Sequence, residues 1–430
     1  MFEWNTVDAL GDLERLQLVL EALPDEALMQ RLEAERGRGR DDYPVRPVWN
    51  SLIAVVVFEH SSVASLRREL LRNGQLRPLC GFDPVLGAAA VPPAWAYTRF
   101  IGRLIEQEEE ITQLFDGLLD RLKEALPELG EVLAVDGKEL HSRARGPSKK
   151  VDRDGRRETD ADWGVKTAKS TGADGQSWQK VKSWFGFTIH LVVDATYELP
   201  EGFEVTKASA GEQPVAHRLL DRLQERHQEL LERCQYFAGD RGYDDGKLVR
   251  RVWDEHRIKP VIDIRNCWRD GEQSKLVTGQ ENVVYSYDGE VSCICPKTGT
   301  ERGMCYGGFE RARATLKYRC PAKQLGIECA GMEQCPVASA VRIPLQEDRR
   351  IFTAVARSSY AWKDIYAKRT SVERINSRLA RPFGLEHHFI RGKAKMQLRC
   401  TMALCVMLAM ALGRIRSDQP QHMRSLLRSA

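Results

Sequence analysis

The sequence predicts an α/β protein with a mixed sheet, preceded by an all-helical region and interrupted by a cysteine-rich insertion. Between residues 126 and 265, apolar strand patterns alternate with amphipathic helical patterns, as they do in α/β proteins. Residues 1–125 show only helical periodicity, and seven of the 11 cysteines fall within residues 266–350. Helical patterns return over residues 351–430, which we expect to complete the α/β domain and to end in a basic helix.

Caps and breaks mark the helices of the N-terminal region. In SSVASLRRELLRNG, Ser62 can cap a helix that carries Val63, Leu66 and Leu70 on one face and stops at Gly74. The prolines of VPPAWAYTRF can open a further helix. Short basic helices joined in this way fit a DNA-binding helix-turn-helix set or a plain helical bundle equally well.

In the central region, two apolar strand patterns each stop at an aspartate. Asp136 follows residues 132–135 in GEVLAVDGKEL, and Asp240 follows residues 236–239 in QYFAGDRGYDD. Ligands gather at the carboxyl ends of strands in open α/β sheets, so both aspartates are candidate site residues. Each also has a structural explanation, Asp136 in a hairpin turn and Asp240 at the start of a loop.

Other residues of the central region have predicted structural roles that bear on the two aspartates. We expect residues 143–182, which are polar and rich in Gly, Lys and Asp, to form a long loop. The next helix already has Asp244 or Asp245 to cap it, which weakens a capping role for Asp240. His190, inside the apolar run FTIHLVV, is expected to be a structural histidine.

A third acidic candidate comes from the helical pattern YAKRTSVERINSRL. Tyr366, Arg369 and Glu373 share one helix face. The buried stripe of the same helix is formed by apolar residues on another face, namely Ile365, Val372, Ile375 and Leu379. Taken alone, the polar face also fits a solvated surface with an Arg–Glu pair.

Together these motifs resemble those of the DDE-type insertion-sequence transposases. The matching elements are AVDGKEL, FAGDRGYDD with its D-x-G-Y pattern, and Y-x2-R-x3-E, in that order, and the resemblance extends over nearly the whole chain. It implies a ribonuclease-H-like catalytic domain, with Asp136, Asp240 and Glu373 as catalytic and metal-binding residues. One departure is Ala380, where the longer family signature has a lysine; Arg378 or Arg381 is expected to supply that charge.

The resemblance also implies the chemistry and the partners. Three carboxylates would hold two Mg²⁺ ions, for which Mn²⁺ can substitute, and these ions support in-line attack at phosphorus. The partner is double-stranded DNA at transposon ends and targets, and synapsis of two ends implies at least a homodimer. Lys138, Tyr366, Arg369 and the basic C-terminal helix would contact DNA. The alternatives are a transposase-derived DNA-binding protein without catalysis and a ribonuclease-H-like nuclease.

Charge and hydropathy agree with a nucleic-acid partner. The net charge is only +4, but residues 363–430 hold 14 Lys or Arg against 4 Asp or Glu; a solvated basic face is the alternative explanation. The N-terminus lacks signal-peptide features, and the apolar run 400–412 is too short to span a bilayer. We therefore expect a cytoplasmic, nucleoid-associated bacterial protein without membrane partners.

The cysteines of the insertion predict a structural zinc site. Cys320, Cys329 and Cys335, with Cys293 or Cys295, could provide four thiolates. The spacing contains no C-x2-C knuckle, and reduced cysteines packed as small hydrophobic side chains are the alternative.

Overall fold

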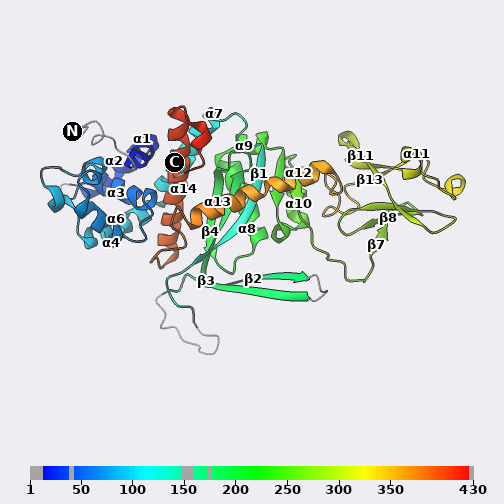
Figure 1. Ribbon diagram of the computed structural model, residues 1–430, viewed down its shortest axis with the longest axis horizontal. Coiled ribbons are helices and arrows are strands. Elements are labelled where there is room, and N and C mark those ends of the chain that lie inside the picture. Colours follow the sequence, from blue (N-terminus) through cyan, green and yellow to red (C-terminus); the bar gives the residue numbers. More distant parts are fainter. Residues whose placement is uncertain (1–12, 38–42, 148–157, 172–176, 426–430) are drawn as a thin grey trace, which may run out of the picture.

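The computed structural model describes residues 13–37, 43–147, 158–171 and 177–425. The molecule is elongated, with N-terminal helices at one end, a central sheet, and the insertion at the other end (Figure 1). One hydrophobic core runs from the N-terminal helices into the sheet, and a second, smaller core belongs to the insertion. The sheet that carries the two candidate aspartates is therefore part of the larger packed body.

The N-terminal region is helical, as the periodicity predicts. Ser62 caps α4 by accepting a hydrogen bond from the Ser65 amide at 3.2 Å, and Leu66 and Leu70 are fully buried. Pro93 is the N-cap residue of α6. The helices are α1 (Glu14–Ala22), α2 (Glu26–Arg36), α3 (Val45–Val57), α4 (Val63–Arg72), α5 (Leu76–Cys80), α6 (Ala94–Glu106) and α7 (Glu108–Ala125).

The central sheet has the ribonuclease-H-like arrangement that the resemblance implies. Its strand order is β2-β3-β1-β5-β6, with β4 also paired to β3. β4, β3 and β1 are antiparallel neighbours, whereas β5 and β6 run parallel to β1. The strands are β1 (Val132–His141), β2 (Asp162–Thr171), β3 (Ser177–Asp194), β4 (Pro200–Lys207), β5 (Tyr236–Gly239) and β6 (Lys259–Ile262). The helices that connect them are α8 (Glu212–Arg226), α9 (Gln228–Arg233) and α10 (Gly246–Asp254).

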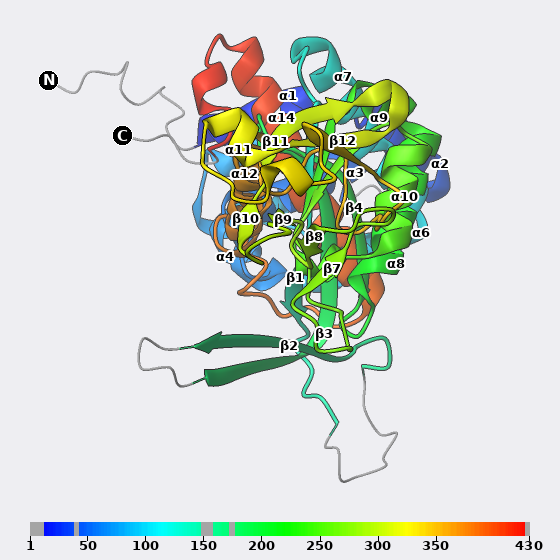
Figure 2. The same cartoon turned by 90° about the vertical axis from the view of Figure 1, so that its right-hand side faces the viewer.

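A two-stranded arm replaces part of the loop that we predicted over residues 143–182. β2 pairs with the first half of β3, from Asp162 opposite Gly186 to Thr171 opposite Ser177, and this hairpin projects from the body (Figures 1 and 2). The prediction failed because residues 163, 165, 167 and 178–183 of these strands are exposed, so their composition resembles that of a loop. At Gly186, β3 changes neighbours, and a Cβ there would lie 2.1 Å from the Leu140 carbonyl oxygen. Only glycine fits this crossing.

The insertion is built from short antiparallel strands. One sheet has the order β10-β9-β8-β7 and the other has the order β11-β12-β13. Their bounds are β7 (Ser274–Leu276), β8 (Val283–Ser286), β9 (Val291–Ile294), β10 (Glu301–Gly303), β11 (Cys305–Glu310), β12 (Thr315–Arg319) and β13 (Ala340–Pro344), with α11 (Pro321–Leu325) after β12.

Two abutting helices and one long helix complete the described chain. They are α12 (Tyr360–Lys368), α13 (Thr370–Ala380) and α14 (Lys393–Arg416). We predicted a single helix here, and the structure has two that meet at Arg369. The predicted stripe is nevertheless confirmed, because Ile365, Val372, Ile375 and Leu379 are all buried.

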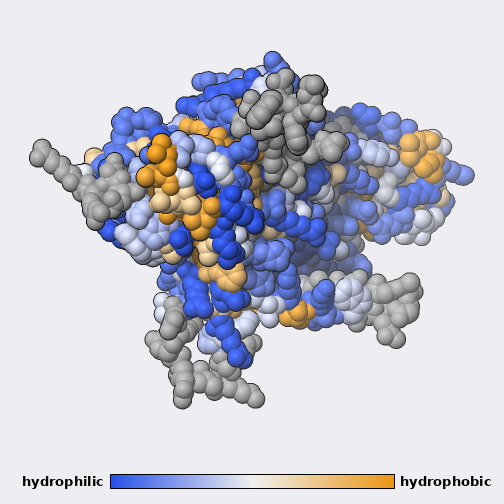
Figure 3. Space-filling model, turned by 60° about the vertical axis from the view of Figure 1, so that its left-hand side comes forward, coloured by the Kyte–Doolittle hydropathy of each residue, from blue (hydrophilic) through white to orange (hydrophobic). Residues whose placement is uncertain are grey.

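The basic C-terminal helix is not the DNA-facing helix that we predicted. Every residue of α14 from Leu398 to Arg414 is buried, and the helix packs against α1, α7 and β4. Its length and composition would allow it to cross a membrane, but 94% of its most apolar window is buried inside the protein, and the face in Figure 3 is mostly hydrophilic. The prediction was wrong because the basic residues lie mainly at the two ends of the helix and do not form a continuous basic face. The middle of the helix lies in the main hydrophobic core.

Candidate active site

The two motif aspartates are neighbours across parallel strands. Val135 of β1 lies opposite Gly239 of β5, so the residues that follow them, Asp136 and Asp240, lie side by side. Asp240 follows the end of β5, as predicted, but β1 continues to His141, so Asp136 lies within a strand and not in a hairpin turn. The continuous apolar run ends at Val135, so the sequence suggested that the strand ends there. In the structure, hydrogen bonding to β3 continues beyond Asp136.

The surroundings of Asp136 disfavour its ionised form. Burial raises the pKa of its carboxyl group, and the negative charge of Asp240 adds to that effect. Lys166 and Arg369 oppose the increase. Asp136 Oδ2 accepts a hydrogen bond of 3.0 Å from Asn376 Nδ2. A carboxylate whose pKa is raised by burial, and only partly lowered again by nearby positive charges, is typical of a functional site.

Asp240 has the loop-start role that we considered, in addition to its place at the site. Its Oδ1 accepts a hydrogen bond of 2.8 Å from the Gly242 amide and so caps the short turn 241–243. Asp245, in contrast, caps α10 by accepting a hydrogen bond from the Leu248 amide at 3.0 Å. The turn fixes one oxygen of Asp240 and leaves Oδ2 available for a ligand.

The third predicted acid lies on α13, which packs against β1. Glu373 Oε1 is 2.7 Å from Arg369 Nη2, and its side chain is 51% exposed. Arg369 lies over the Tyr366 ring, 5.5 Å from its centroid, and its charge also reaches Asp136. The Arg–Glu pair is therefore present, but it stands beside the strand aspartates and is not a remote surface pair.

A family model for the transposase DDE domain matches residues 128–409, about two thirds of the chain. This chain belongs to the DDE transposase family. The matched region begins just before β1 and reaches into α14, so it includes all three predicted acids. A comparison with curated proteins gives no match.

Several residues at this site of the transposase were not predicted. Asn376 and Lys166 contact it directly: Lys166 Nζ donates to the Gly137 carbonyl oxygen at 2.8 Å. Glu212 also lies there, 3.8 Å from Lys166 Nζ. Asn376 could have been found from its spacing of three residues after Glu373, which keeps it near the same helix face. Lys166 and Glu212 carry no comparable signal, because only the fold brings them to β1.

The predicted DNA-contacting residues have different surroundings. Lys138 is largely buried and lies 3.6 Å from Glu386 Oε1, and burial lowers the pKa of its amine. Arg378 donates to the carbonyl oxygens of Glu198 and Arg424 at 2.6 and 2.8 Å. Arg381 is exposed and has no side-chain partner within the part of the chain that the structure describes. Among these three, Arg381 is the one available for an external phosphate.

The cysteines proposed for zinc line one cavity of about 20 Å³ in the insertion. Cys295 Sγ and Cys329 Sγ are 3.9 Å apart, and Cys335 Sγ accepts a hydrogen bond of 3.3 Å from Asn282 Nδ2. Donation by the Thr298 hydroxyl and by nearby backbone amides lowers the pKa of Cys295 to about 6. Cys293 and Cys320 complete the lining.

Neither cluster is arranged around a single point. Within the described ranges, no three His, Cys, Asp or Glu side chains are positioned to hold a metal ion. At the strand edge, Lys166 and Arg369 compensate the carboxylates in part. The oxygen donors there suit Mg²⁺, and the thiols of the insertion suit Zn²⁺.

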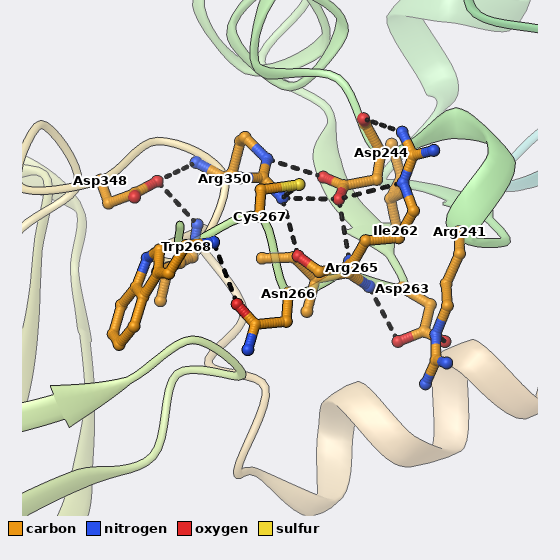
Figure 4. A network of polar contacts seen from close by, with 12 residues as sticks. Arg241, Asp244, Ile262, Asp263, Arg265, Asn266, Cys267, Trp268, Asp348 and Arg350 are labelled. Atoms are coloured by element: carbon orange, nitrogen blue, oxygen red, sulfur yellow. Dashed lines mark hydrogen bonds and ion pairs between the residues drawn. The ribbon is translucent and has the colours of Figure 1, made fainter. Parts of the chain in front are cut away.

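A buried ionic network ties the insertion to the site (Figure 4). Asp244, four residues after Asp240, accepts from Arg350 Nε and Nη2 at 3.0 and 2.7 Å and from the Arg265 amide at 2.9 Å. Arg241 Nε donates to Asp263 at 2.6 Å. Arg265 and Arg350 belong to the two segments that lead into and out of the insertion. Both connections are thereby held beside the turn that follows Asp240.

Proposed function

We propose that this transposase binds the ends of an insertion sequence and catalyses metal-dependent strand cleavage and strand transfer. Asp136, Asp240 and Glu373 are assigned as the catalytic and metal-binding residues. The observation that carries this proposal is that Asp136 and Asp240 directly follow the paired residues Val135 and Gly239, with Arg369, the partner of Glu373, close enough to act on the charge of Asp136. Two like charges placed about 4 Å apart repel by roughly 4 kcal/mol at an effective dielectric of 20, which gives such a pair no purpose in stability alone.

The residues of the chain have distinct parts in the reaction. Asp136 and Asp240 would hold the divalent ions on a rigid strand edge, and Glu373 would join them from α13. The chemistry that a pair of Mg²⁺ ions supplies, when bound, is activation of the attacking oxygen and neutralisation of the leaving oxygen. Arg369 is paired with Glu373, and in the reaction it would release that carboxylate and bind the phosphate being cut.

DNA binding is assigned to side chains near this edge. Tyr366 is half-buried, and Trp362, with ring centroids 4.7 Å apart, and Arg369 hold its ring in a fixed position. Arg381 supplies a free cation at the end of α13. A transposon has two ends, so we assign at least a homodimer to the assembly that joins them.

The test is cleavage of a DNA fragment that carries the flanks of the element, with Mg²⁺ and with EDTA. Asp136→Asn, Asp240→Asn and Glu373→Gln should each reduce cleavage by more than about 100-fold, the upper range for residues that only support metal ligands. End binding, followed by gel shift, should stay near the wild-type level. Asp364→Asn, on the exposed side of α12, is the control. Substantial cleavage by Asp240→Asn would contradict the assignment.

We also infer that the cysteine cavity holds a structural Zn²⁺. Cys295, Cys329 and Cys335, with Cys293 or Cys320, supply the thiol donors. Sulfurs that share a tetrahedral zinc at about 2.3 Å are about 3.8 Å from one another, close to the 3.9 Å between Cys295 and Cys329.

A further inference from the structure

The carboxylate of Glu212, on α8, lies close enough to both motif aspartates to be affected by their charges. Glu212 is the first residue of α8, and its side chain is 25% exposed. A Cβ built on Gly242 would lie 1.9 Å from Glu212 Oε2 and 2.9 Å from Asp240 Oδ1. A Cβ built on Gly137 would lie 3.5 Å from Glu212 Oε1. Glu212 therefore rests against the glycines that follow the two aspartates.

This position explains the glycine of the D-x-G-Y motif. The backbone at Gly242 is not in the left-handed region, so no unusual conformation requires glycine there. The requirement is space, because any side chain at this residue would displace the Glu212 carboxylate. The motif thus provides room for an acid that lies outside it.

The charges agree with one shared site. Burial raises the pKa of Glu212, and the charges of Asp240 and Asp136 add to the increase, whereas Lys166 opposes it. Lys166 Nζ, at 3.8 Å from Oε1, is too far for a hydrogen bond. The single lysine therefore compensates the carboxylates only in part.

A buried hydroxyl group provides independent support for a ligand at this place. Tyr243, the tyrosine of the same motif, is fully buried, and its hydroxyl has no hydrogen-bond partner in the described structure. Burial raises the pKa of this hydroxyl well above its usual range, and the charges of Glu212, Asp136 and Asp240 add to that effect. Buried hydroxyls normally have a partner, and a water molecule or ion-bound water beside the carboxylates would supply it.

We propose that Glu212 is a further carboxylate of the strand-cleavage site and binds the divalent cation together with Asp136 and Asp240. The proposal rests on the proposed function, since it adds a ligand to the same site. It gives the strand edge an acid besides Asp136 and Asp240 without Glu373, which is paired with Arg369. Glu373 would then complete the site when DNA draws Arg369 away.

Cation binding by the full-length chain tests this assignment without an activity assay. Mn²⁺ titrations would be followed by calorimetry and by the shift of the thermal unfolding midpoint. Glu212→Gln should weaken Mn²⁺ binding by about 10- to 100-fold, the range for loss of a supporting or direct ligand group. Glu225→Gln, an exposed acid on the same helix, is the matched control and should bind like the wild type.

The two proposals fail in different ways. Wild-type affinity in Glu212→Gln, together with weak binding in Asp136→Asn, would remove Glu212 from the site and leave the proposed function intact. Wild-type affinity in both variants would overturn the metal site itself.

A second variant keeps the proposal testable if Glu212→Gln does not fold. Gly242→Ala changes none of the acids, but its Cβ would lie 1.9 Å from Glu212 Oε2 and 2.9 Å from Asp240 Oδ1, so Glu212 has to move the most and Mn²⁺ binding should also weaken. Gly102→Ala is its control, because a Cβ at Gly102 meets nothing within 4 Å. Wild-type Mn²⁺ affinity in Gly242→Ala would show that the position of Glu212 does not matter and would overturn the proposal.

Discussion

The strand-edge carboxylates and the cavity cysteines both bring like side chains together, but different forces hold them. The carboxylates stand on a sheet backed by the main core, where residues 132–135 are almost fully buried. The cysteines lie between short strands over a second, smaller core. Ionised carboxylates repel when they are gathered, whereas cysteines repel only where they lose their protons, as Cys295 does with a pKa of about 6. A cluster of acids therefore indicates a cationic ligand by its position alone, and a cluster of thiols does not.

Removing the proposed zinc should produce the largest difference between the cysteine-rich insertion and the strands that carry the carboxylates. Purified protein should carry about one Zn²⁺ per chain, and Cys329→Ser should lose it. The insertion should then become sensitive to protease, because a structural zinc site contributes folding free energy directly. Strands β1 and β5 should remain protected. Cys305→Ser is the control, since Cys305 does not line the cavity; absence of zinc from the wild type would make the cysteines packing residues.

The network around Asp244 couples the two regions, and breaking it should have the next largest effect. Asp244→Ala leaves Arg350 without its carboxylate partner at a site where the Asp244 side chain is only 2% exposed. Removal of one partner of a buried pair costs about 3–5 kcal/mol in the free energy of unfolding. Denaturant unfolding would measure the loss. Arg349→Ala breaks a pair with the half-exposed Asp254 and should cost less than about 1 kcal/mol; equal losses in the two variants would disprove the coupling.

The acid cluster should also make stability depend on pH when EDTA removes divalent ions. The pKa of Asp136 is raised in the folded protein, so folding favours its protonated form. Its contribution is fully present below the unfolded pKa of about 3.8 and is lost as pH rises through the raised value. At neutral pH, Asp136→Asn should therefore be more stable than the wild type, by about 1.4 kcal/mol for each unit of the shift. Asp364→Asn should show no such gain, and equal stability of Asp136→Asn and wild type at all pH values would contradict the prediction.

The smallest expected effect concerns the exposed cation beside the site. Arg381→Ala should lower the slope of log affinity against log salt concentration by about 0.9, the value for one phosphate contact in duplex DNA. Fluorescence anisotropy with an end fragment at several salt concentrations measures it. Arg251→Ala removes an arginine that is already paired with Asp221 and Glu255, and should leave the slope unchanged. An unaltered slope in Arg381→Ala would place the DNA elsewhere.

Local patterns were sufficient to predict the strands, most helices and the order of the motifs. Apolar runs identified β1 and β5, and helical spacing identified the buried stripe of α12 and α13. These features depend on neighbours in the sequence, which are visible without a fold. The two-stranded arm was missed because residues 163, 165, 167 and 178–183 of its strands are exposed, so their composition resembles that of a loop.

Contacts between distant segments could not be predicted in the same way. Glu212 and Lys166 approach the aspartates because α8 and β2 pack beside β1, and nothing in their own neighbourhoods marks them. The burial of α14 was also missed, because we interpreted the basic residues at its two ends as a DNA-contacting surface and gave too little weight to its apolar centre. The glycine of D-x-G-Y was visible, but the acid for which it makes room was not.

The position of α14 also has a consequence for how the protein is made. This helix packs against α1, α3, α6 and α7, which the ribosome releases first, and against β4. Its own residues emerge almost last, roughly 15 to 60 s after α6 at 5–20 residues per second. The N-terminal helices can pack against one another before then, but their faces that contact α14 stay uncovered until α14 emerges. An unfinished chain would therefore expose apolar surface on these helices.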